Sequence, residues 1–390
     1  MIIQELFRLY DISPDVKIST RSCEASSIRF SRALARMTRG VYLFYFYACY
    51  IHIYYMSQSK KKKIVVVGGG TGTHTLLRGL KRYADKLDIT AIVTMADSGG
   101  STGRLRDEFG QLPVGDARMA LVALSADVDS HDELLRELFL YRFSKGKGLN
   151  GHNFGNLLLT ALTDILGSEV AAIDAASRIL RVRGRVVPVT TDNVNLQATY
   201  DDGLVVVGEH EIDEPPESRH TSRITKLSLT PSATINPVAT TAITEADMII
   251  LGPGDLYTSI LANCVVDGFV DALLDSKAKL VYICNLMSRL GQTVGMQASE
   301  HVAEISRYTK RTPDFILINN SSFPDDLLAR YAEEGNHPIE NDCTGESGIL
   351  VCSDLVSTEA VATIAGDVLK RSLIRHDSDK LASALLQIFD

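Results

Sequence analysis

The chain has 390 residues, of which 45% are hydrophobic and 23% are charged, so it can bury a large core and is not globally disordered. Its formal net charge of −8 lacks the basic surplus of a nucleic-acid binder, so we expect no nucleic-acid partner. None of the six cysteines forms a C-x-x-C pair or a zinc spacing with histidine. This pattern is typical of reduced thiols in a cytoplasmic protein.

The first sixty residues differ in character from the rest of the chain. Residues 14–39 are rich in arginine and serine, and residues 41–56 form an uncharged, tyrosine-rich apolar stretch. That stretch is shorter than the roughly 20 apolar residues of a membrane helix, so we expect no stable membrane insertion. Three interpretations stay open: translation from Met56 with an upstream misread, a membrane-associated tail, or an ordered element. We treat residues 1–59 as an extension outside the fold and residues 60–390 as a single α/β domain.

Residues 64–95 indicate a strand, a glycine loop, a helix and a second strand. Ile64–Val67 is a β-branched run typical of a buried parallel strand, and five loop residues follow it directly. Leucines at helical spacing predict a helix to about Tyr83, and Ile89–Met95 indicates the next strand. The right-handed crossover places the loop at the carboxyl edge of the sheet, where its amides suit a phosphate, although a tight turn without ligand remains the alternative. The candidate ligand residues of this loop are Gly69, Gly70, Thr71 and Gly72.

The second strand runs into a glycine- and hydroxyl-rich segment, residues 97–106, at the same sheet edge. Small hydroxyl side chains and bare amides suit phosphate or sugar oxygens, and arginines there can neutralise phosphate. Asp97 stands where a dinucleotide fold places its ribose-binding acid, and it could equally hold a divalent cation. A flexible polar loop is the alternative. The candidates here are Asp97, Ser98, Gly99, Gly100, Ser101 and Arg104.

Further polar residues stand at helix starts and strand ends. Helices are expected through Ala126, over 134–143 and over 157–166, and strands over 248–251, 280–284 and 315–318. A second strand-to-helix glycine turn follows the strand at 248–251, and its tyrosine is suited to stacking on a base. Capping, structural hydrogen bonding or a plain turn accounts for these positions equally well. The candidates are Asp116, His152, Asn153, Gly252, Gly254, Tyr257 and Asn285.

Short strands over 185–190, 195–200 and 204–207 predict a sheet extension or a small β insertion near 185–230. The acidic segment 209–220 holds two prolines and is expected to form a surface loop. Helices are expected over 361–373 and 380–388. The whole pattern predicts an α/β fold with a doubly wound, mostly parallel sheet and a helical C-terminus.

Six segments in this order resemble the YvcK-like gluconeogenesis factors, over roughly residues 62–375. That family is similar in turn to the CofD-like 2-phospho-L-lactate transferases of deazaflavin coenzyme synthesis. One departure is Leu290–Thr293, which stands where the family usually carries Pro-Gly-Glu-Thr, so an acid is lost. The segments are Gly68–Gly72, Asp97–Arg106, Gly115–Arg118, Gly151–Asn156, Gly252–Ser259 and Asn285–Met287.

The resemblance implies a Rossmann-like three-layer fold and a cytoplasmic bacterial factor that binds a UDP-sugar such as UDP-N-acetylglucosamine. It links the protein to gluconeogenic growth, cell shape and peptidoglycan synthesis, with a cell-wall or regulatory protein partner and a homo-oligomer as further expectations. The first two loops would hold the nucleotide-sugar, His152 and Asn153 would line the pocket, and Tyr257 would contact the ligand.

The CofD-like alternative is a transferase that moves a phospholactyl group to a deazaflavin acceptor, with Mg²⁺ on Asp97. A nicotinamide dehydrogenase is a weaker third hypothesis, because the G-x-G-x-x-G pattern is incomplete at Thr73.

Overall fold

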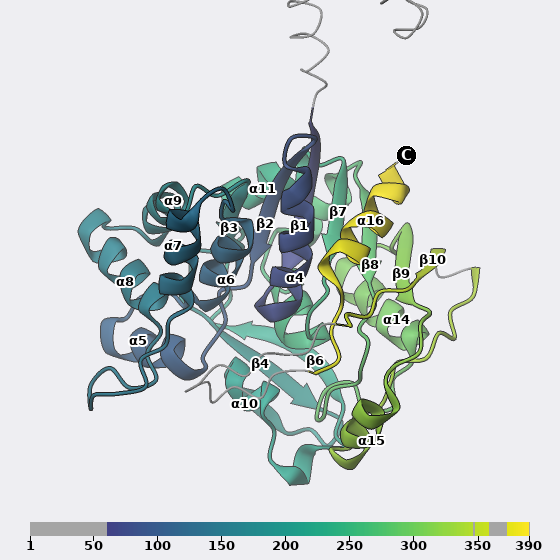
Figure 1. Cartoon of the computed structure of the whole chain (residues 1–390). Coiled ribbons are helices and arrows are strands. Elements are labelled where there is room, and N and C mark those ends of the chain that lie inside the picture. Colours follow the sequence, from purple (N-terminus) through teal and green to yellow (C-terminus); the bar gives the residue numbers. More distant parts are fainter. Residues whose placement is uncertain (1–60, 346–347, 359–372, 390) are drawn as a thin grey trace, which may run out of the picture. The chain divides into compact units, whose positions relative to one another are not determined.

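The computed structural model describes residues 61–345, 348–358 and 373–389, which belong to one compact unit beginning at Lys61 (Figure 1). The N-terminal extension and nearly all of the helix expected over 361–373 lie outside the described residues. Among the helices that are described, none combines the length and the apolar character needed to cross a bilayer.

A seven-stranded sheet forms the centre of the described part, and all neighbouring strands in it pair in parallel. Its order is β10-β9-β8-β7-β1-β2-β3. The β-branched and apolar runs found in the sequence form its central strands, because a strand covered on both faces must be apolar throughout. The strands are β1 (Lys62–Gly68), β2 (Leu87–Val93), β3 (Arg185–Pro188), β7 (Met248–Leu251), β8 (Lys279–Ile283), β9 (Phe315–Asn319) and β10 (Ile349–Ser353).

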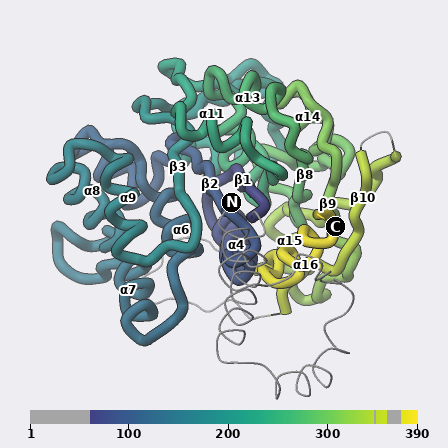
Figure 2. Tube along the Cα trace, turned by 90° about the horizontal axis from the view of Figure 1, so that it is seen from above, coloured from purple at the N-terminus to yellow at the C-terminus, as the bar shows by residue number. Residues whose placement is uncertain are grey.

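The side chains of β1 alternate between two hydrophobic cores, one on each face of the sheet. Ile64 and Val66 pack in one core, and Val65 and Val67 pack in the other. Figure 2 shows the two helical layers on either side of the sheet. The predicted Rossmann-like three-layer α/β fold with a helical C-terminus is confirmed. One layer holds α4 (Gly70–Leu80), α6 (Gly115–Leu124) and α16 (Ser378–Phe389), and the other holds α11 (Pro237–Thr244), α13 (Phe269–Asp275) and α14 (Ala298–Thr309).

The strands expected near 185–230 divide between two sheets. β3 pairs with β2 at the edge of the main sheet, because Val186 and Val187 are both buried there. The next strands form a separate antiparallel sheet with β4 in the middle, and the burial of β4 alternates as in a sheet with one covered face. This small sheet consists of β4 (Asn195–Tyr200), β5 (Val205–Val207) and β6 (Ile224–Thr230).

A group of helices lies beside the β3 end of the main sheet (Figure 1). One of them corrects an expectation: the glycine-rich segment read as a loop contains a helix from Gly100, which buries Leu105. The group consists of α5 (Gly100–Phe109), α7 (Ser130–Leu140), α8 (Phe154–Leu166) and α9 (Glu169–Ile179). The other helices used below are α10 (Glu209–Asp213) and a π-helix over Leu256–Leu261.

Candidate functional site

The strand order reverses between β1 and β7. From β1 the sheet grows through β2 to β3, and from β7 it grows the other way through β8 and β9 to β10. Open α/β sheets bind ligands at such a switch point, outside the carboxyl ends of the strands. The glycine loop after β1 and the glycine turn after β7 both leave the sheet here, since Val67 pairs with Leu251. This switch point is therefore the candidate site.

The two glycine segments pack directly on each other. Thr73 Oγ1 donates to the carbonyl of Pro253 at 3.4 Å, and Asn263 Nδ2 donates to the carbonyl of Gly68 at 3.3 Å. A Cβ atom added to Gly72 would lie 2.4 Å from the oxygen of Pro253, which leaves no room for any side chain. Glycine is required at position 72 because two backbones meet there.

Asn285 ties a third strand to the same edge. It follows β8, and its Nδ2 donates to the carbonyl of Gly254 at 2.7 Å. The hydroxyl of Tyr282 donates to Asn285 Oδ1 at 3.2 Å and so fixes the amide orientation. The polar residues at the ends of β1, β7 and β8 thus form one connected surface.

Asp116 caps the first glycine loop. Helix α4 begins at Gly70, whose φ of +62° is in the left-handed region, and the Gly70 amide donates to Asp116 Oδ1 at 2.8 Å. A Cβ on Gly69 would lie 2.4 Å from Asp116 Oδ2. A carboxylate therefore already occupies part of the anion site that a helix N-terminus offers. A phosphate bound to this loop has to share the Gly70 amide with Asp116 or displace the carboxylate.

Asp97 is folded inward against the same region. The Gly99 amide donates to Asp97 Oδ1 at 2.8 Å. A Cβ atom added to Gly115 would lie 2.4 Å from Asp97 Oδ2. Burial raises the pKa of Asp97. Burial together with the Asp97 charge raises the pKa of Asp116 to about 7. Neighbouring carboxyl groups that are partly removed from solvent retain a proton to higher pH for this reason.

Helix α10 brings two more carboxyl groups to the site, which corrects the expected surface loop at 209–220. Its backbone is tied to the second loop, since the His210 amide donates to Ser98 Oγ at 3.1 Å. Ile212 is fully buried and anchors the helix. Burial and the Asp97 charge raise the pKa of Glu209 well above its ordinary value. In the sequence, the one indication of α10 is Ile212, an apolar residue among acidic ones.

Asp213, at the end of α10, joins three elements. It accepts hydrogen bonds from Arg289 Nη2 at 2.7 Å and from Gln292 Nε2 at 3.0 Å. Thr258 Oγ1 donates to it at 3.4 Å from the π-helix. Burial and the Asp213 charge raise the pKa of Asp255, in the turn after β7, to about 6. Gln292 stands at the position where the family acid is lost, and its amide donates to Asp213, which a glutamate could not do when ionised.

The segment before α8 packs against the start of α5. The Asn153 amide donates to Ser101 Oγ at 3.1 Å, and His152 Nδ1 lies 3.3 Å from the same hydroxyl. Burial, with the nearby Arg104 charge, lowers the pKa of His152, so its imidazole is neutral at neutral pH. Asn153 also caps α8 by accepting from the Asn156 amide at 3.2 Å. These three predicted residues therefore lie together in structural hydrogen bonds.

Arg118 supplies a fixed positive charge behind the two aspartates. Its Nε donates to Asn156 Oδ1 at 2.7 Å, and its charge lowers the pKa of both Asp97 and Asp116, partly offsetting their burial. Burial lowers the pKa of Arg118 to about 10, which leaves it charged at neutral pH.

Tyr257 and Arg104 do not face the glycine loops. Tyr257 is 2% exposed, and its hydroxyl donates to Glu304 Oε2 at 3.0 Å and lies 3.3 Å from the carbonyl of Ile224. Arg104 is exposed on α5 and donates to the carbonyl of Asn150 at 3.1 Å. The predicted residues gathered at the switch point are Gly69, Gly70, Thr71, Gly72, Asp97, Ser98, Gly99, Gly100, Asp116, Gly252, Gly254 and Asn285.

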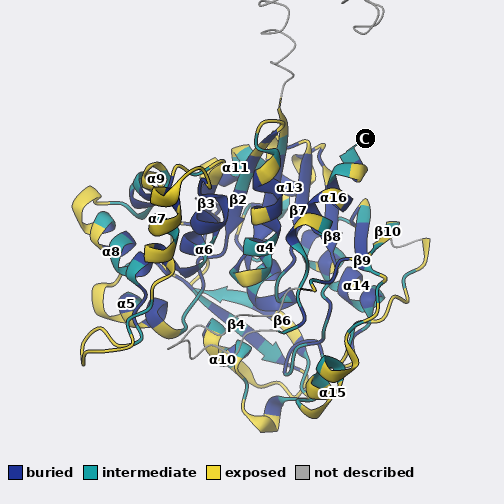
Figure 3. Cartoon of the chain, in the orientation of Figure 1, coloured by how far each residue is buried: buried dark blue, intermediate teal, exposed yellow. Residues whose placement is uncertain are grey.

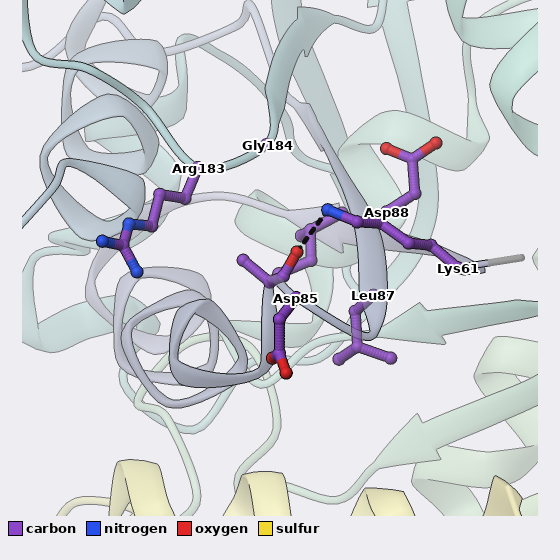
Figure 4. Close-up of a pocket in the computed structure, with 8 residues that line it drawn as sticks. Lys61, Asp85, Leu87, Asp88, Arg183 and Gly184 are labelled. Atoms are coloured by element: carbon purple, nitrogen blue, oxygen red, sulfur yellow. Dashed lines mark hydrogen bonds between the residues drawn. The ribbon is translucent and has the colours of Figure 1, made fainter. Parts of the chain in front are cut away.

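Two hollows of the described part lie at the opposite, amino edge of the sheet. One has a volume of about 710 Å³ and lies near Lys279 and Phe315. The other, of about 380 Å³, is drawn in Figure 4, where Lys61 Nζ donates to the carbonyl of Ala84 at 2.5 Å. Neither touches the glycine loops. The smaller hollow is lined by Lys61, Ala84, Asp85, Leu87, Asp88, Ile89, Arg183 and Gly184.

The sequence and the fold both match known proteins. The family model described as 2-phospho-L-lactate transferase CofD matches residues 64–369. The chain belongs to the CofD family. It is 42% identical over 323 residues to the gluconeogenesis factor of Bacillus subtilis, with 82% of this chain and 95% of that protein covered. It is 40% identical over 322 residues to the gluconeogenesis factor of Halalkalibacterium halodurans, with 81% and 93% covered.

A solved structure supports the same grouping. The crystal structure of a UPF0052 family member from Bacillus halodurans aligns with a TM-score of 0.75 and 38% identity, and covers 84% of this chain and 99% of that one. The resemblance to the YvcK-like gluconeogenesis factors is thus confirmed for this CofD-family chain.

Proposed function

We propose that this CofD-family protein is a gluconeogenesis factor that binds a nucleotide-sugar of the UDP-N-acetylglucosamine type at the β1/β7 switch point. The observation that carries the proposal is the convergence there of two packed glycine segments with the Asp97 loop. Exposed loop amides and small hydroxyl groups at this edge suit a diphosphate and a sugar. We further propose that the protein regulates rather than transforms its ligand.

The partly buried carboxyl groups at the site set a condition on binding. A diphosphate brought beside Asp97, Asp116 and Glu209 meets like charge, so binding has to be accompanied by protons on these groups or by a cation. We therefore expect nucleotide-sugar affinity to rise either at lower pH or with Mg²⁺ present. The cellular role proposed is cytoplasmic, in morphogenesis and cell-wall synthesis during gluconeogenic growth, through a cell-wall or regulatory protein partner.

Calorimetric titration of the full chain with UDP-N-acetylglucosamine, with and without Mg²⁺, tests this proposal. Mass analysis of the ligand afterwards distinguishes binding from turnover. We expect saturable binding and intact ligand. Gly69→Val should abolish binding, because its side chain would displace Asp116 from the loop, whereas Gly148→Val, in open space, should bind normally. Absence of binding at millimolar UDP-N-acetylglucosamine would refute the proposal.

The Asp97–Asp116 pair favours a second candidate, the CofD-like phospholactyl transferase. Asp116 Oδ1 accepts from the Gly70 amide and Asp97 Oδ1 accepts from the Gly99 amide, and the Asp97 carboxyl also accepts a hydrogen bond from the Thr102 side chain. In the described part no three acidic, histidine or cysteine side chains are arranged to hold a metal ion. In this candidate Mg²⁺ would therefore have to be held mostly by substrate phosphates and water, with Asp97 as its protein ligand.

In this second candidate Mg²⁺ would neutralise phosphate charge. The acceptor hydroxyl would form the new P–O bond, and the leaving nucleotide phosphate would take the electron pair of the broken one. Asp116, with its pKa near neutral, would accept the hydroxyl proton. Product formation from nucleotide-activated lactate and a deazaflavin, lost in Asp97→Asn and retained in the exposed control Asp107→Asn, would support it. Unchanged turnover in Asp97→Asn would refute the metal role.

A further inference from the structure

The inward face of helix α14 carries a histidine. The buried residues of that face are Ala298, His301, Val302, Ile305 and Thr309, at the spacing of one side of a helix. The face packs on the core beside β8, and Figure 3 shows the buried residues gathered along the central strands. His301 is fully buried, and a buried imidazole needs a polar partner inside the core.

The imidazole begins a chain of hydrogen bonds that ends at the second glycine turn. His301 Nδ1 lies 3.1 Å from the hydroxyl oxygen of Tyr282 on β8. That hydroxyl donates to Asn285 Oδ1 at 3.2 Å, and Asn285 Nδ2 donates to the carbonyl of Gly254 at 2.7 Å. The chain of bonds therefore joins α14 to the switch point through side chains on β8 and directly after it.

The direction of each bond fixes the position of the proton on the imidazole. The one hydroxyl proton of Tyr282 goes to Asn285 Oδ1, a stronger acceptor than the Cys284 thiol, which also lies beside the hydroxyl. The hydroxyl oxygen then has to accept from His301, so Nδ1 carries the ring proton and Nε2 carries a lone pair. His301 Nε2 is buried and has no hydrogen-bond partner among the described residues, which a lone pair tolerates better than an N–H group does. Burial lowers the pKa of His301 to about 4, so the ring is neutral at neutral pH.

The last bond of the chain orients the peptide between Gly254 and Asp255. This peptide is trans, so its carbonyl oxygen and its N–H lie on opposite sides of one plane. Because Asn285 holds the oxygen of Gly254, the N–H of Asp255 points away from Asn285. In the part of the chain that the structure describes, this N–H donates to no other group. It is therefore available to a ligand phosphate at the switch point.

We propose that His301 is a positioning residue of the candidate site. Through Tyr282 and Asn285 it holds the peptide after Gly254 so that the N–H of Asp255 faces the ligand phosphate. The identity of the ligand rests on the function proposed above, whereas the orientation of the peptide does not. His301 acts through its neighbours and touches no ligand itself.

The tautomer of His301 gives a test that needs no ligand. Long-range nitrogen–proton NMR spectra of the full chain distinguish a ring protonated at Nδ1 from one protonated at Nε2. The signals that are lost in His301→Asn assign the residue. We expect a neutral ring with its proton on Nδ1 at neutral pH. A proton on Nε2 instead overturns the proposal, because the Tyr282 oxygen would then lack its donor.

Hydrogen exchange measures whether the ring holds the turn. The amides of Ser259 and Ile260 donate to the carbonyl of Asp255 at 3.0 and 3.1 Å, so they should exchange faster when the preceding peptide is released. His301→Leu removes both ring nitrogens at similar volume, and we expect about tenfold faster exchange of these two amides. His301→Asn places an amide nitrogen where Nδ1 stands and should restore slow exchange. The matched control is Thr309→Val, which alters another buried polar residue of the same helix face and should leave the two amides unchanged.

The outcomes separate positioning from packing. Equal exchange in His301→Leu and in the unaltered chain overturns the proposal. Equal acceleration in His301→Leu and Thr309→Val also overturns it, because the packing of α14 alone would then control the turn. If His301→Leu does not fold, Tyr282→Phe removes the same link without added bulk, and it should show the same acceleration.

Titration with UDP-N-acetylglucosamine then connects the positioning to the ligand. Affinity should fall about tenfold in His301→Leu and stay within about twofold of the unaltered chain in His301→Asn and Thr309→Val. Faster exchange in His301→Leu with full affinity overturns the role of the Asp255 N–H in ligand binding. An unaltered chain that binds no nucleotide-sugar refutes the proposed function instead, and the NMR and exchange results then decide the positioning on their own.

Discussion

Replacing Gly72 by alanine tests whether the two glycine segments act as one packed unit. The new Cβ would lie 2.4 Å from the oxygen of Pro253, 2.7 Å from its carbonyl carbon and 2.9 Å from the amide nitrogen of Gly254. All three are backbone atoms, so no flexible side chain can yield, and the loop and the turn have to separate. Overpacking of this kind costs about 1–3 kcal/mol, and we expect a loss of about 2 kcal/mol in the free energy of unfolding.

Two other glycines separate the clash from backbone strain. Gly70 has a left-handed φ of +62° but only Ser259 Oγ, at 3.7 Å, near a new Cβ, so Gly70→Ala should cost about 1 kcal/mol through strain alone. Gly148 has no atom within 4 Å of a new Cβ, and Gly148→Ala should change stability by less than about 0.5 kcal/mol.

Urea unfolding of the three variants, followed by titration with UDP-N-acetylglucosamine, gives the test. We expect stability to fall in the order Gly148→Ala, Gly70→Ala, Gly72→Ala, and affinity to fall most for Gly72→Ala. Equal stability of Gly72→Ala and Gly148→Ala would refute the close packing. If Gly72→Ala is destabilised but binds with full affinity, the close packing is supported and the proposed position of the ligand is refuted.

Three further predictions concern the carboxyl groups and the buried tyrosine. Asp116→Asn keeps an acceptor for the Gly70 amide but removes a group whose pKa rises from 3.8 to about 7 on folding. The stability that this group contributes is fully present below about pH 4 and is lost as pH rises to 7. In urea unfolding, the free energy of unfolding of the variant should therefore rise relative to that of the unaltered chain between pH 4 and pH 7, and parallel pH profiles would contradict this. Tyr257→Phe should lower the free energy of unfolding by about 1 kcal/mol in the same assay and leave nucleotide-sugar affinity unchanged. A loss of affinity would show that Tyr257 contacts the ligand after all. Asp213→Ala should cost about 2 kcal/mol, because Arg289 and Gln292 lose their acceptor, and a neutral effect would show that α10 is held by Ile212 alone.

The central strands and the glycine turns could be predicted from the sequence because each has a strong local signal. Ile64–Val67 of β1 and the whole of β7 are continuous apolar runs, and both are followed at once by glycines. The doubly wound fold then places these turns at one sheet edge, so the first loop and Asp97 fall together. The local sequence pattern and the topology of the fold were therefore enough to predict that these two loops lie at the candidate site.

Elements with mixed local signals could not be predicted. Helix α5 begins with glycine, serine, threonine and glycine, which have low helix propensity, and it forms because its inner face packs against the neighbouring helices. Helix α10 has five residues, too few for a periodic pattern, and is held by Ile212 and by the bonds of Asp213. Tyr257 was expected to face the ligand because it follows a glycine turn, but the π-helix directs it into the core.

The separation of Tyr257 from the site clarifies what recognises the ligand. With this side chain in the core, the described residues at the switch point offer glycine amides, small hydroxyl groups and carboxyl groups, all suited to phosphate, sugar and cation. Asp116 accepts a hydrogen bond from the Gly70 amide, so an incoming phosphate and this carboxylate would compete for the same donor. Protonation of Asp116 weakens its hold on that amide, which couples ligand binding to pH near neutrality. If the proposed function is correct, the protein should bind the nucleotide-sugar only together with a proton or a divalent cation. Titration in two buffers of different ionisation enthalpy measures the proton uptake, which a loop with unoccupied amides would not show.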